Sequence, residues 1–448
     1  MSQSTFLEMI PFWAQMRGYI VSASALVNAP TLMVMVAMLA LTWFRYQENN
    51  KGRKAQQKPS VLLKIDDFPP IEELENFKWE TTEPIKLRPF KPKYHLTMAL
   101  ENLDPSELMP MDKTYKDRIM HRRDLLKKFP EIVRRVNKSP TAPDSSSDEK
   151  EQQRQEEDPQ VRAAISELYT FVMGIYLPTR YPLMFQLYPT QYETGPAIMV
   201  RNLVTGEILP TELGNRRKSE WALEILGKSV DEDMFVLLPE DRKSPLDGDV
   251  EKNEKEKKEK DKDNQTPIPS YILEAYISCF PSGFDPRAKL GKPLRDIHTP
   301  VPGYKEKLRT SMDRFFHKLE PGKFVKRVNW SVTTKEVGLF APPGLGADVH
   351  GSVGERMKAL EVGDLDVEKT LLRCERQTLY RLPRSKAIIF SLHTYTYPIR
   401  DVKGEDSGAS AEEMAQAIDG LSAGSIPEIA VYKRAPVWGK AVKEYLRS

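Results

Sequence analysis

His298 is the histidine of this sequence whose backbone is held by prolines. It lies in the segment RDIHTPVPGY, where Pro300 and Pro302 restrict the chain between a predicted strand and a predicted helix. An imidazole held in this way can bind a metal ion through one ring nitrogen, or it can be packed as a structural side chain. The spacing alone leaves both interpretations open.

The other five histidines have simpler surroundings. His121 and His317 lie in charged, predicted helices, where an exposed position is expected. His350 belongs to PPGLGADVHG, a glycine-rich segment without the spacing of a nucleotide-binding loop, and His95 follows a tyrosine in KPKYHLTMAL. His393 alternates with tyrosines in FSLHTYTYP, as a half-buried strand residue does, and is the second choice as a metal ligand.

Two cysteines, Cys279 and Cys374, are present. They exclude a disulfide framework and a CxxC site for zinc or an iron–sulfur cluster, and free thiols suit a reducing compartment. The sequence contains no GxGxxG, GxxxxGK[ST], HExxH or GxSxG motif. Dinucleotide-binding, P-loop, zincin and serine-hydrolase chemistry therefore have no support.

Three segments combine basic residues with large apolar ones: VKRVNWSV, LLRCERQTLYRLPRSKAIIF and LPTRYPLMF. A ligand with an apolar body and anionic groups needs this combination. Haem is such a ligand, because its carboxylates favour arginine or tyrosine and its ring favours aliphatic and aromatic side chains. Salt-bridged strand ends have the same composition.

The elements that must position these residues are mixed. Helical spacing extends over 115–136, with a break or kink at Pro130, over 159–177, ending at Pro178, and over 306–319, ending at Pro321. SYILEAYISCF, FVKRVNWSVTT and KAIIFSLHTYTYPI are typical of strands. Since the strands gather late in the chain, with helices before and between them, we predict an α+β fold with an antiparallel sheet.

The N-terminal region has a different composition. No charged residue occurs from Gly18 to Phe44, which is long enough for a membrane-spanning helix. Basic residues follow it, so the positive-inside bias predicts a single-pass anchor with the bulk of the chain in the cytosol. From the length and topology of the anchor, we expect the membrane to be that of the endoplasmic reticulum. We thus divide the chain into a tail (1–17), an anchor (18–44), a basic linker (45–65) and one α+β domain (66–448).

Two inserts in that domain are predicted to be disordered, at about 139–159 and 241–267, because they are charged and nearly free of apolar side chains. KGEDSGASAEEMAQ, from Lys403, is predicted to be a surface excursion. The formal net charge is +3, from 67 basic and 64 acidic residues, so no nucleic-acid partner is expected.

The chain resembles the haem-dependent oxidative N-demethylase family, in its alpha-subunit-like branch and a fungal-type, membrane-anchored form. The residues that carry the resemblance span most of 80–400, in this order: KYHLTMALENLDPSELMPMDKTYKDRIMHRRDLL, GIYLPTRYPLMF, ISCFPSGF, GKPLRDIHTPVPGYKEKL, MDRFFHKLEPGKFVKRVNWSV and ERQTLYRLPRSKAIIFSLHTYTYPI.

The resemblance implies a PAS-like fold around haem b and the oxidative N-demethylation of a small amine, or a related oxidation of a specialised metabolite. It also implies dioxygen as co-substrate and a separate flavin and iron–sulfur reductase, since this chain has no cysteine cluster or nucleotide loop of its own. Oxidation of the carbon next to nitrogen gives a carbinolamine, which collapses to amine and aldehyde.

On this reading His298 is the proximal iron ligand, with His393 as second choice, and Glu375 is a distal acid–base group. Residues expected to contact the haem are Arg327, Arg376 and Arg381 at its carboxylates, with Arg180 as a weaker candidate, and Tyr304 and Trp330 along its ring.

Two rival interpretations remain. Cys279 or Cys374 could ligate haem as a thiolate, although the aromatic and glycine loop typical of cysteine-ligated monooxygenases surrounds neither. The alternative to an enzyme is a non-catalytic, membrane-tethered PAS-like sensor or scaffold, which would need no open iron site and no electron donor.

Overall fold

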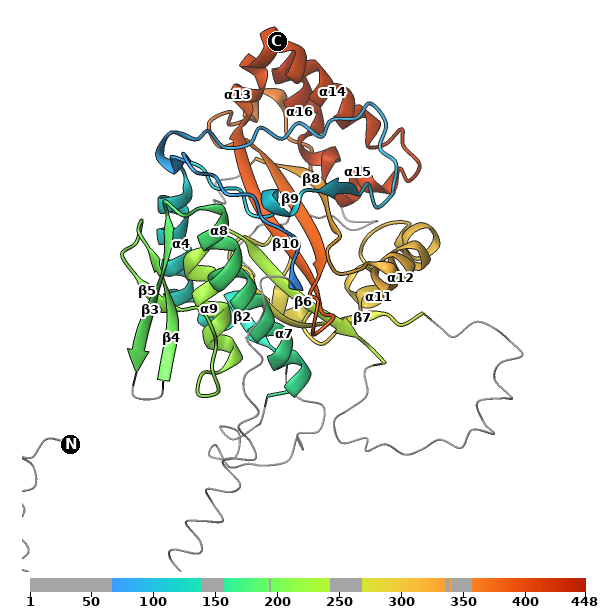
Figure 1. Ribbon diagram of the computed structural model, residues 1–448. Helices are drawn as coiled ribbons and strands as arrows, with labels where there is room; N and C mark the ends of the chain where they lie inside the picture. The colour runs from blue at the N-terminus through green and yellow to red at the C-terminus, as the bar shows by residue number, and fades with distance from the viewer. Residues whose placement is uncertain (1–66, 138–156, 193–194, 242–267, 335–338, 341–356) are drawn as a thin grey trace, which may run out of the picture. The chain divides into compact units, whose positions relative to one another are not determined.

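The computed structural model describes residues 67–137, 157–192, 195–241, 268–334, 339–340 and 357–448. All of them belong to one compact unit that extends from Leu63 to Ser448. Within these residues, helices surround an antiparallel sheet (Figure 1), which confirms the predicted α+β class.

The main sheet has seven strands in the order β1-β8-β9-β10-β6-β7-β2. Every neighbouring pair is antiparallel. The three segments predicted as strands form β7, β8 and β10, and the long strand β9 lies between β8 and β10. The bounds are β1 (Glu101–Leu103), β2 (Arg134–Val136), β6 (Asp233–Pro239), β7 (Tyr271–Ile277), β8 (Phe324–Thr333), β9 (Leu371–Arg381) and β10 (Ile388–Pro398).

A second, three-stranded sheet has the order β3-β4-β5. Its strands are β3 (Phe185–Tyr192), β4 (Gly195–Asn202) and β5 (Ile208–Pro210). At its base Phe185 and Val200 are buried, whereas Leu187 and Ile198 further along the hairpin are exposed.

One hydrophobic core joins one face of the main sheet to the helices from the first half of the chain. Phe324, Tyr380 and Ile389 lie side by side on β8, β9 and β10 and belong to this core. The helices and turns that contribute to it are α4 (Tyr115–Lys128), α5 (Pro130–Val133), α7 (Pro159–Thr170), the π-helix η4 (Phe171–Tyr176), α8 (Leu177–Arg180) and α9 (Ser219–Ser229).

A second core joins Val325 and Leu379 on the opposite face of β8 and β9 to later helices. Figure 1 shows α14 and α16 together at the C-terminal end and α11 and α12 at another side of the sheet. These elements are α11 (Leu294–Ile297), η6 (Tyr304–Leu308), α12 (Arg309–Lys318), α13 (Ile399–Gly404), α14 (Ala409–Gly420), α15 (Glu428–Tyr432) and α16 (Ala435–Arg447).

Two prolines behave differently from each other. Pro130 separates α4 from α5, as predicted, but the residues predicted to continue the helix, 134–136, form strand β2 against β7. Pro178 does not end its helix: it falls in the first turn of α8, where its missing N–H is not needed. The π-helix η4 ahead of it shifts the hydrogen-bond register and creates that new first turn.

The prediction of a surface excursion from Lys403 is wrong. Residues 409–420 form helix α14, and Met414, Ala415 and Ile418 on it are buried in the second core. Alanines at helical spacing let α14 contact α16 closely, although the segment has few large apolar side chains to reveal this from sequence.

The predicted anchor at 18–44, and the tail and linker beside it, lie outside the described residues. No helix in the part of the chain that the structure describes has the length and apolar character needed to cross a membrane. Most of the two inserts and the PPGLGADVHG segment also lie outside it. Of the insert ends that are described, Asp158 caps α7 by accepting from the N–H groups of Gln160 and Val161.

Candidate functional site

His298 directly follows α11 and begins the turn that leads to η6. Its Nδ1 lies 2.8 Å from the carbonyl oxygen of Leu294, and its ring stacks on Tyr304 with the centroids 4.9 Å apart. Nε2 has no hydrogen-bond partner among the described residues. Since a carbonyl only accepts, Nδ1 carries the proton and Nε2 keeps a free lone pair, which is the state that binds iron.

Burial lowers the pKa of His298, and the nearby cations Lys289 and Arg327 lower it further, while the Leu294 carbonyl opposes them. The neutral imidazole is therefore favoured. Tyr304 is buried, and burial raises the pKa of its hydroxyl to about 12, so it faces His298 as a neutral ring. Gly303 makes the turn possible, because its φ is +72° and a Cβ there would meet Ile426 Cδ1 at 2.7 Å.

Five polar residues gather next to this turn, and we call them the β8–β9 polar group: Arg327, Asn329, Glu375, Gln377 and Lys433. Strand register places Arg327 opposite Gln377 and Asn329 opposite Glu375, so these four side chains share one face of the sheet. The charge of Arg327 acts on both Glu375 and His298. The predicted residues His298, Tyr304, Arg327 and Glu375 thus come together.

Arg327 has no hydrogen-bond partner in this group, and one carboxylate oxygen of Glu375 has none. The guanidinium of Arg327 donates no hydrogen bond to any described residue, its Nε is fully buried, and burial lowers its pKa. Glu375 is 5% exposed; its Oε2 accepts from Gln377 Nε2 at 3.2 Å, but its Oε1 is buried without a partner. Buried polar atoms without partners are costly, so a water or a ligand that pairs with them would stabilise this place.

Lys433, which follows α15, completes the group from the other end of the chain. Its Nζ donates to Asn329 Oδ1 at 3.0 Å and to the carbonyl of Trp330 at 2.5 Å. That carbonyl is free because β1 pairs only with residues 324–326 of β8. The rings of Trp330 and Tyr94 lie 5.3 and 6.0 Å from the ammonium.

Burial lowers the pKa of Lys433 to about 8. In the unfolded chain it titrates near 10.4, so between pH 8 and pH 10 the unfolded state binds more protons and stability rises with pH. We expect the unfolding free energy of the wild type, relative to Lys433→Met, to increase by about 2 kcal/mol from pH 7 to pH 10. Urea unfolding of both proteins across this pH range measures the difference in unfolding free energy. The titration of the tyrosines and cysteines, which both proteins contain, cancels in this difference. A difference that does not change with pH would contradict the prediction.

The segment that carries Tyr94 crosses the loop after α14 very closely. The Tyr94 N–H donates to Gly420 O at 3.1 Å, and the Ser425 N–H donates to Tyr94 O at 3.1 Å. A Cβ on Gly424 would overlap Tyr94 O, and one on Gly420 would overlap Pro92 O. These two glycines therefore fix where Tyr94 lies relative to Arg327 and Lys433.

We expect Gly424→Ala to destabilise the fold by about 2 kcal/mol, because the overlap forces backbone to move. Gly404→Ala is the matched control, since a Cβ there meets nothing within 4 Å. Urea unfolding compares them, and equal stability of the two variants would contradict the close contact.

Two of the three arginines predicted at haem carboxylates are engaged elsewhere. Arg376 donates to the carbonyls of Leu108 and Glu107. Arg381 donates to three backbone carbonyls and to Tyr271 Oη. Arg180, the weaker choice, donates to Glu72 O. Of these four arginines, Arg327 has its donors unused.

Trp330, predicted along the haem ring, is buried and packs edge-on against Phe90 with centroids 5.9 Å apart. Its neighbour Asn329 points to the face of Arg327, so the indole points to the other face of β8. Trp330 lies beside Lys433 rather than beside His298.

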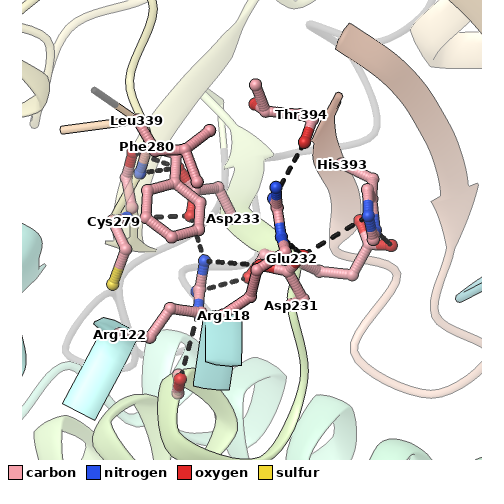
Figure 2. Close-up of polar contacts among 12 residues, drawn as sticks. Arg118, Arg122, Asp231, Glu232, Asp233, Cys279, Phe280, Leu339, His393 and Thr394 are labelled. Carbon is pink, nitrogen blue, oxygen red and sulfur yellow. Dashed lines mark hydrogen bonds and ion pairs between the residues drawn. The ribbon is translucent and has the colours of Figure 1, made fainter. Parts of the chain in front are cut away.

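His393 lies in a separate, buried network of charges (Figure 2). Its Nδ1 is 3.1 Å from Glu232 Oε1 and its Nε2 is 3.4 Å from Asp231 Oδ2, so carboxylates face both ring nitrogens. Arg118 pairs with Asp231 and donates to Thr394 O. With both nitrogens occupied, His393 is a poorer iron ligand than His298.

The two cysteines are buried and free. Burial raises the pKa of each thiol to about 12, which disfavours the thiolate that a haem iron would need. The described residues contain no group of three or more His, Cys, Asp or Glu side chains able to hold a metal ion. A single histidine such as His298 suffices for haem.

Sequence reasoning missed Lys433, Tyr94, Asn329 and Gln377. Asn329 and Gln377 follow from two-residue spacing once Arg327 and Glu375 are chosen, so strand alternation could have found them. Lys433 lies in YKRAP, which has the composition of an exposed turn.

Comparison with known proteins gives one family match. The family model described as haem-dependent oxidative N-demethylase, alpha subunit-like, matches residues 99–443, more than three quarters of the chain. A comparison with curated protein sequences finds no match.

Proposed function

Because this chain belongs to the haem-dependent oxidative N-demethylase, alpha subunit-like family, whose name indicates an oxidoreductase, we propose that it removes an N-methyl group from an amine by haem-dependent oxidation. The observation that carries the proposal is the His298 imidazole, with Nδ1 bound to a carbonyl and Nε2 free.

The residues around His298 fit a haem. Half-buried apolar side chains lie nearby and can cover a ring face: Ile297 and Val301 are in the segment of His298, and Ile426 lies against Gly303. Lys289 and the unpaired Arg327 supply positive charge. Arg327 is free to meet a carboxylate, of the haem or of the substrate. We propose haem b, with His298 as the residue that would bind its iron through Nε2.

Bound haem would supply a redox-active iron at which dioxygen is reduced. The chain's own residues would do the rest. The Leu294 carbonyl keeps the proton on Nδ1 of His298, and Glu375, with its free Oε1, is placed to accept a proton from the amine or its oxidised form. Electrons would come from a separate flavin and iron–sulfur protein.

We further propose the PAS-like fold and the membrane anchor. Five adjacent antiparallel strands, β8-β9-β10-β6-β7, with α11 and α12 between β7 and β8, support the first. The uncharged run from Gly18 to Phe44 supports the second, with lipid as a partner and the bulk of the chain in the cytosol. Membrane fractionation of the full chain and of a form lacking residues 1–44 tests the anchor.

Absorption spectra test the haem directly. The full-length chain, purified in detergent and supplied with haem, is expected to give a Soret band in the oxidised and reduced states and a histidine-type shift with carbon monoxide. Aldehyde release from an N-methylamine, with an artificial reductant and oxygen, then tests the reaction. A folded protein that takes up no haem would overturn the proposal.

A further inference from the structure

Arg327 and Glu375 are placed to form a salt bridge with each other, yet they do not. They are diagonal neighbours on one face of β8 and β9, a geometry that long side chains can span. No ion pair of 4 Å or less joins them, although the charge of each acts on the other. Glu375 Oε1 and Arg327 Nε remain buried without partners.

An occupant that satisfies both side chains needs two kinds of atom. The guanidinium only donates, so it needs an acceptor, best a carboxylate. The free oxygen of Glu375, when ionised, only accepts, so it needs a donor such as an ammonium. An α-amino acid carries both groups on one carbon atom.

We propose that the β8–β9 polar group binds the substrate, and that this substrate is an N-methyl amino acid whose carboxylate meets Arg327 and whose ammonium meets Glu375. This inference rests on the proposed function, and it names the class of amine that the enzyme demethylates. It also gives Arg327 to the substrate, not to a haem carboxylate.

The charges around the group favour a ligand that brings a carboxylate. Lys433 and Arg373 also act electrostatically on Glu375, so three cations surround one carboxylate. Lys433 uses two of its three N–H donors within the protein. A simple alkylammonium would add a fourth positive charge to this buried place, which the carboxylate of an amino acid offsets.

Glu375 indicates whether Arg327 binds the substrate or a carboxylate of the haem. A haem carboxylate beside Arg327 would bring a second anion towards Glu375 and would leave Oε1 without a donor. An N-methyl amino acid satisfies both side chains. Lys289, which also acts on His298, remains for the haem.

Calorimetric titration of the full-length chain tests the inference, with haem-free and haem-loaded protein run separately. N-methylglycine and dimethylammonium are the probes, since both carry an N-methyl group and one lacks the carboxylate. We expect N-methylglycine to bind at least tenfold more tightly than dimethylammonium. Arg327→Gln should lower the affinity for N-methylglycine by about 10- to 100-fold, because a charged hydrogen bond is lost, and it should leave the Soret band of the haem-loaded protein unchanged.

Two further variants locate the effect. Glu375→Gln should weaken both ammonium probes. Lys326→Gln is the matched control: it removes a neighbouring positive charge whose side chain points to the other face of β8 and pairs with Glu107, and it should leave both affinities unchanged. Circular dichroism confirms that each variant is folded.

Three results would overturn the inference. They are equal affinity for the two probes, no binding of N-methylglycine to the folded protein, and an Arg327→Gln variant that loses haem binding but keeps its affinity for N-methylglycine. The last would give the guanidinium to a haem carboxylate. Binding of N-methylglycine to a chain that takes up no haem would instead keep the amino-acid site and overturn the proposed oxidation.

Discussion

His298→Ala should abolish haem binding by the full-length chain. The alanine removes the free Nε2, and no other described histidine combines a carbonyl on Nδ1 with an unoccupied Nε2 in the way His298 does. Loss of a residue that merely supports a metal ligand costs about 10- to 100-fold in affinity, so loss of the ligand itself should cost more than about 100-fold. Haem titration followed at the Soret band measures it.

His317→Ala is the control for this experiment, because His317 is exposed on α12 and should keep wild-type affinity. Added imidazole should restore part of the Soret band to His298→Ala by occupying the vacated place. The prediction fails when His298→Ala keeps its haem and His393→Ala loses it, because His393 would then be the residue that binds the iron.

Asp233→Ala should cost about 3–5 kcal/mol of unfolding free energy. The Asp233 carboxylate accepts from Arg122 at 2.7 Å, from Ser278 Oγ and from the N–H groups of Cys279 and Phe280 at 2.8 Å (Figure 2). Arg122 is fully buried, so its charge would remain inside the protein with only the more distant carboxylate of Asp231, 3.9 Å away. Urea unfolding at pH 7 gives the value.

Asp124→Asn, on the same helix as Arg122, is the matched control. Its ion pair with Lys128 is exposed, and its loss should cost less than about 1 kcal/mol. Equal losses in the two variants would mean that the Asp233 network adds no more than a surface pair. Arg122→Met combined with Asp233→Ala should recover part of the stability, because the buried charge is then gone.

The sequence predicted the strands that carry the site better than it predicted the strand register and the hydrogen bonds between distant segments that complete the site. The mixed fold, β7, β8, β10 and the helix ahead of Pro321 follow from local patterns of two and 3.6 residues, and these patterns also place Arg327 and Glu375 on a common face once the register is known. Register itself depends on long-range pairing, which no local pattern contains.

The arginines show the same limit. Arg327, Arg376 and Arg381 look alike in sequence, and hydrogen-bond partners alone distinguish them. Arg376 and Arg381 donate to carbonyls of distant loops, at Leu108 and Leu319, while Arg327 finds none. Lys433 was missed because the chain returns to β8 from more than a hundred residues away, and an exposed-looking YKRAP turn gives no sign of it.

The contact between the Tyr94 segment and the loop after α14 has a consequence for the order in which the protein forms. The Leu96 N–H donates to Ser425 Oγ, 329 positions further along the chain. During synthesis, residues 94–96 therefore cannot make this contact with the loop after α14 until almost the whole chain has been made. Contacts of such separation form late and slowly. A ribosome-bound chain that ends before residue 425 would have the His298 turn but neither Lys433 nor its partner loop, so the ligand site could be completed only when almost all of the chain has been made.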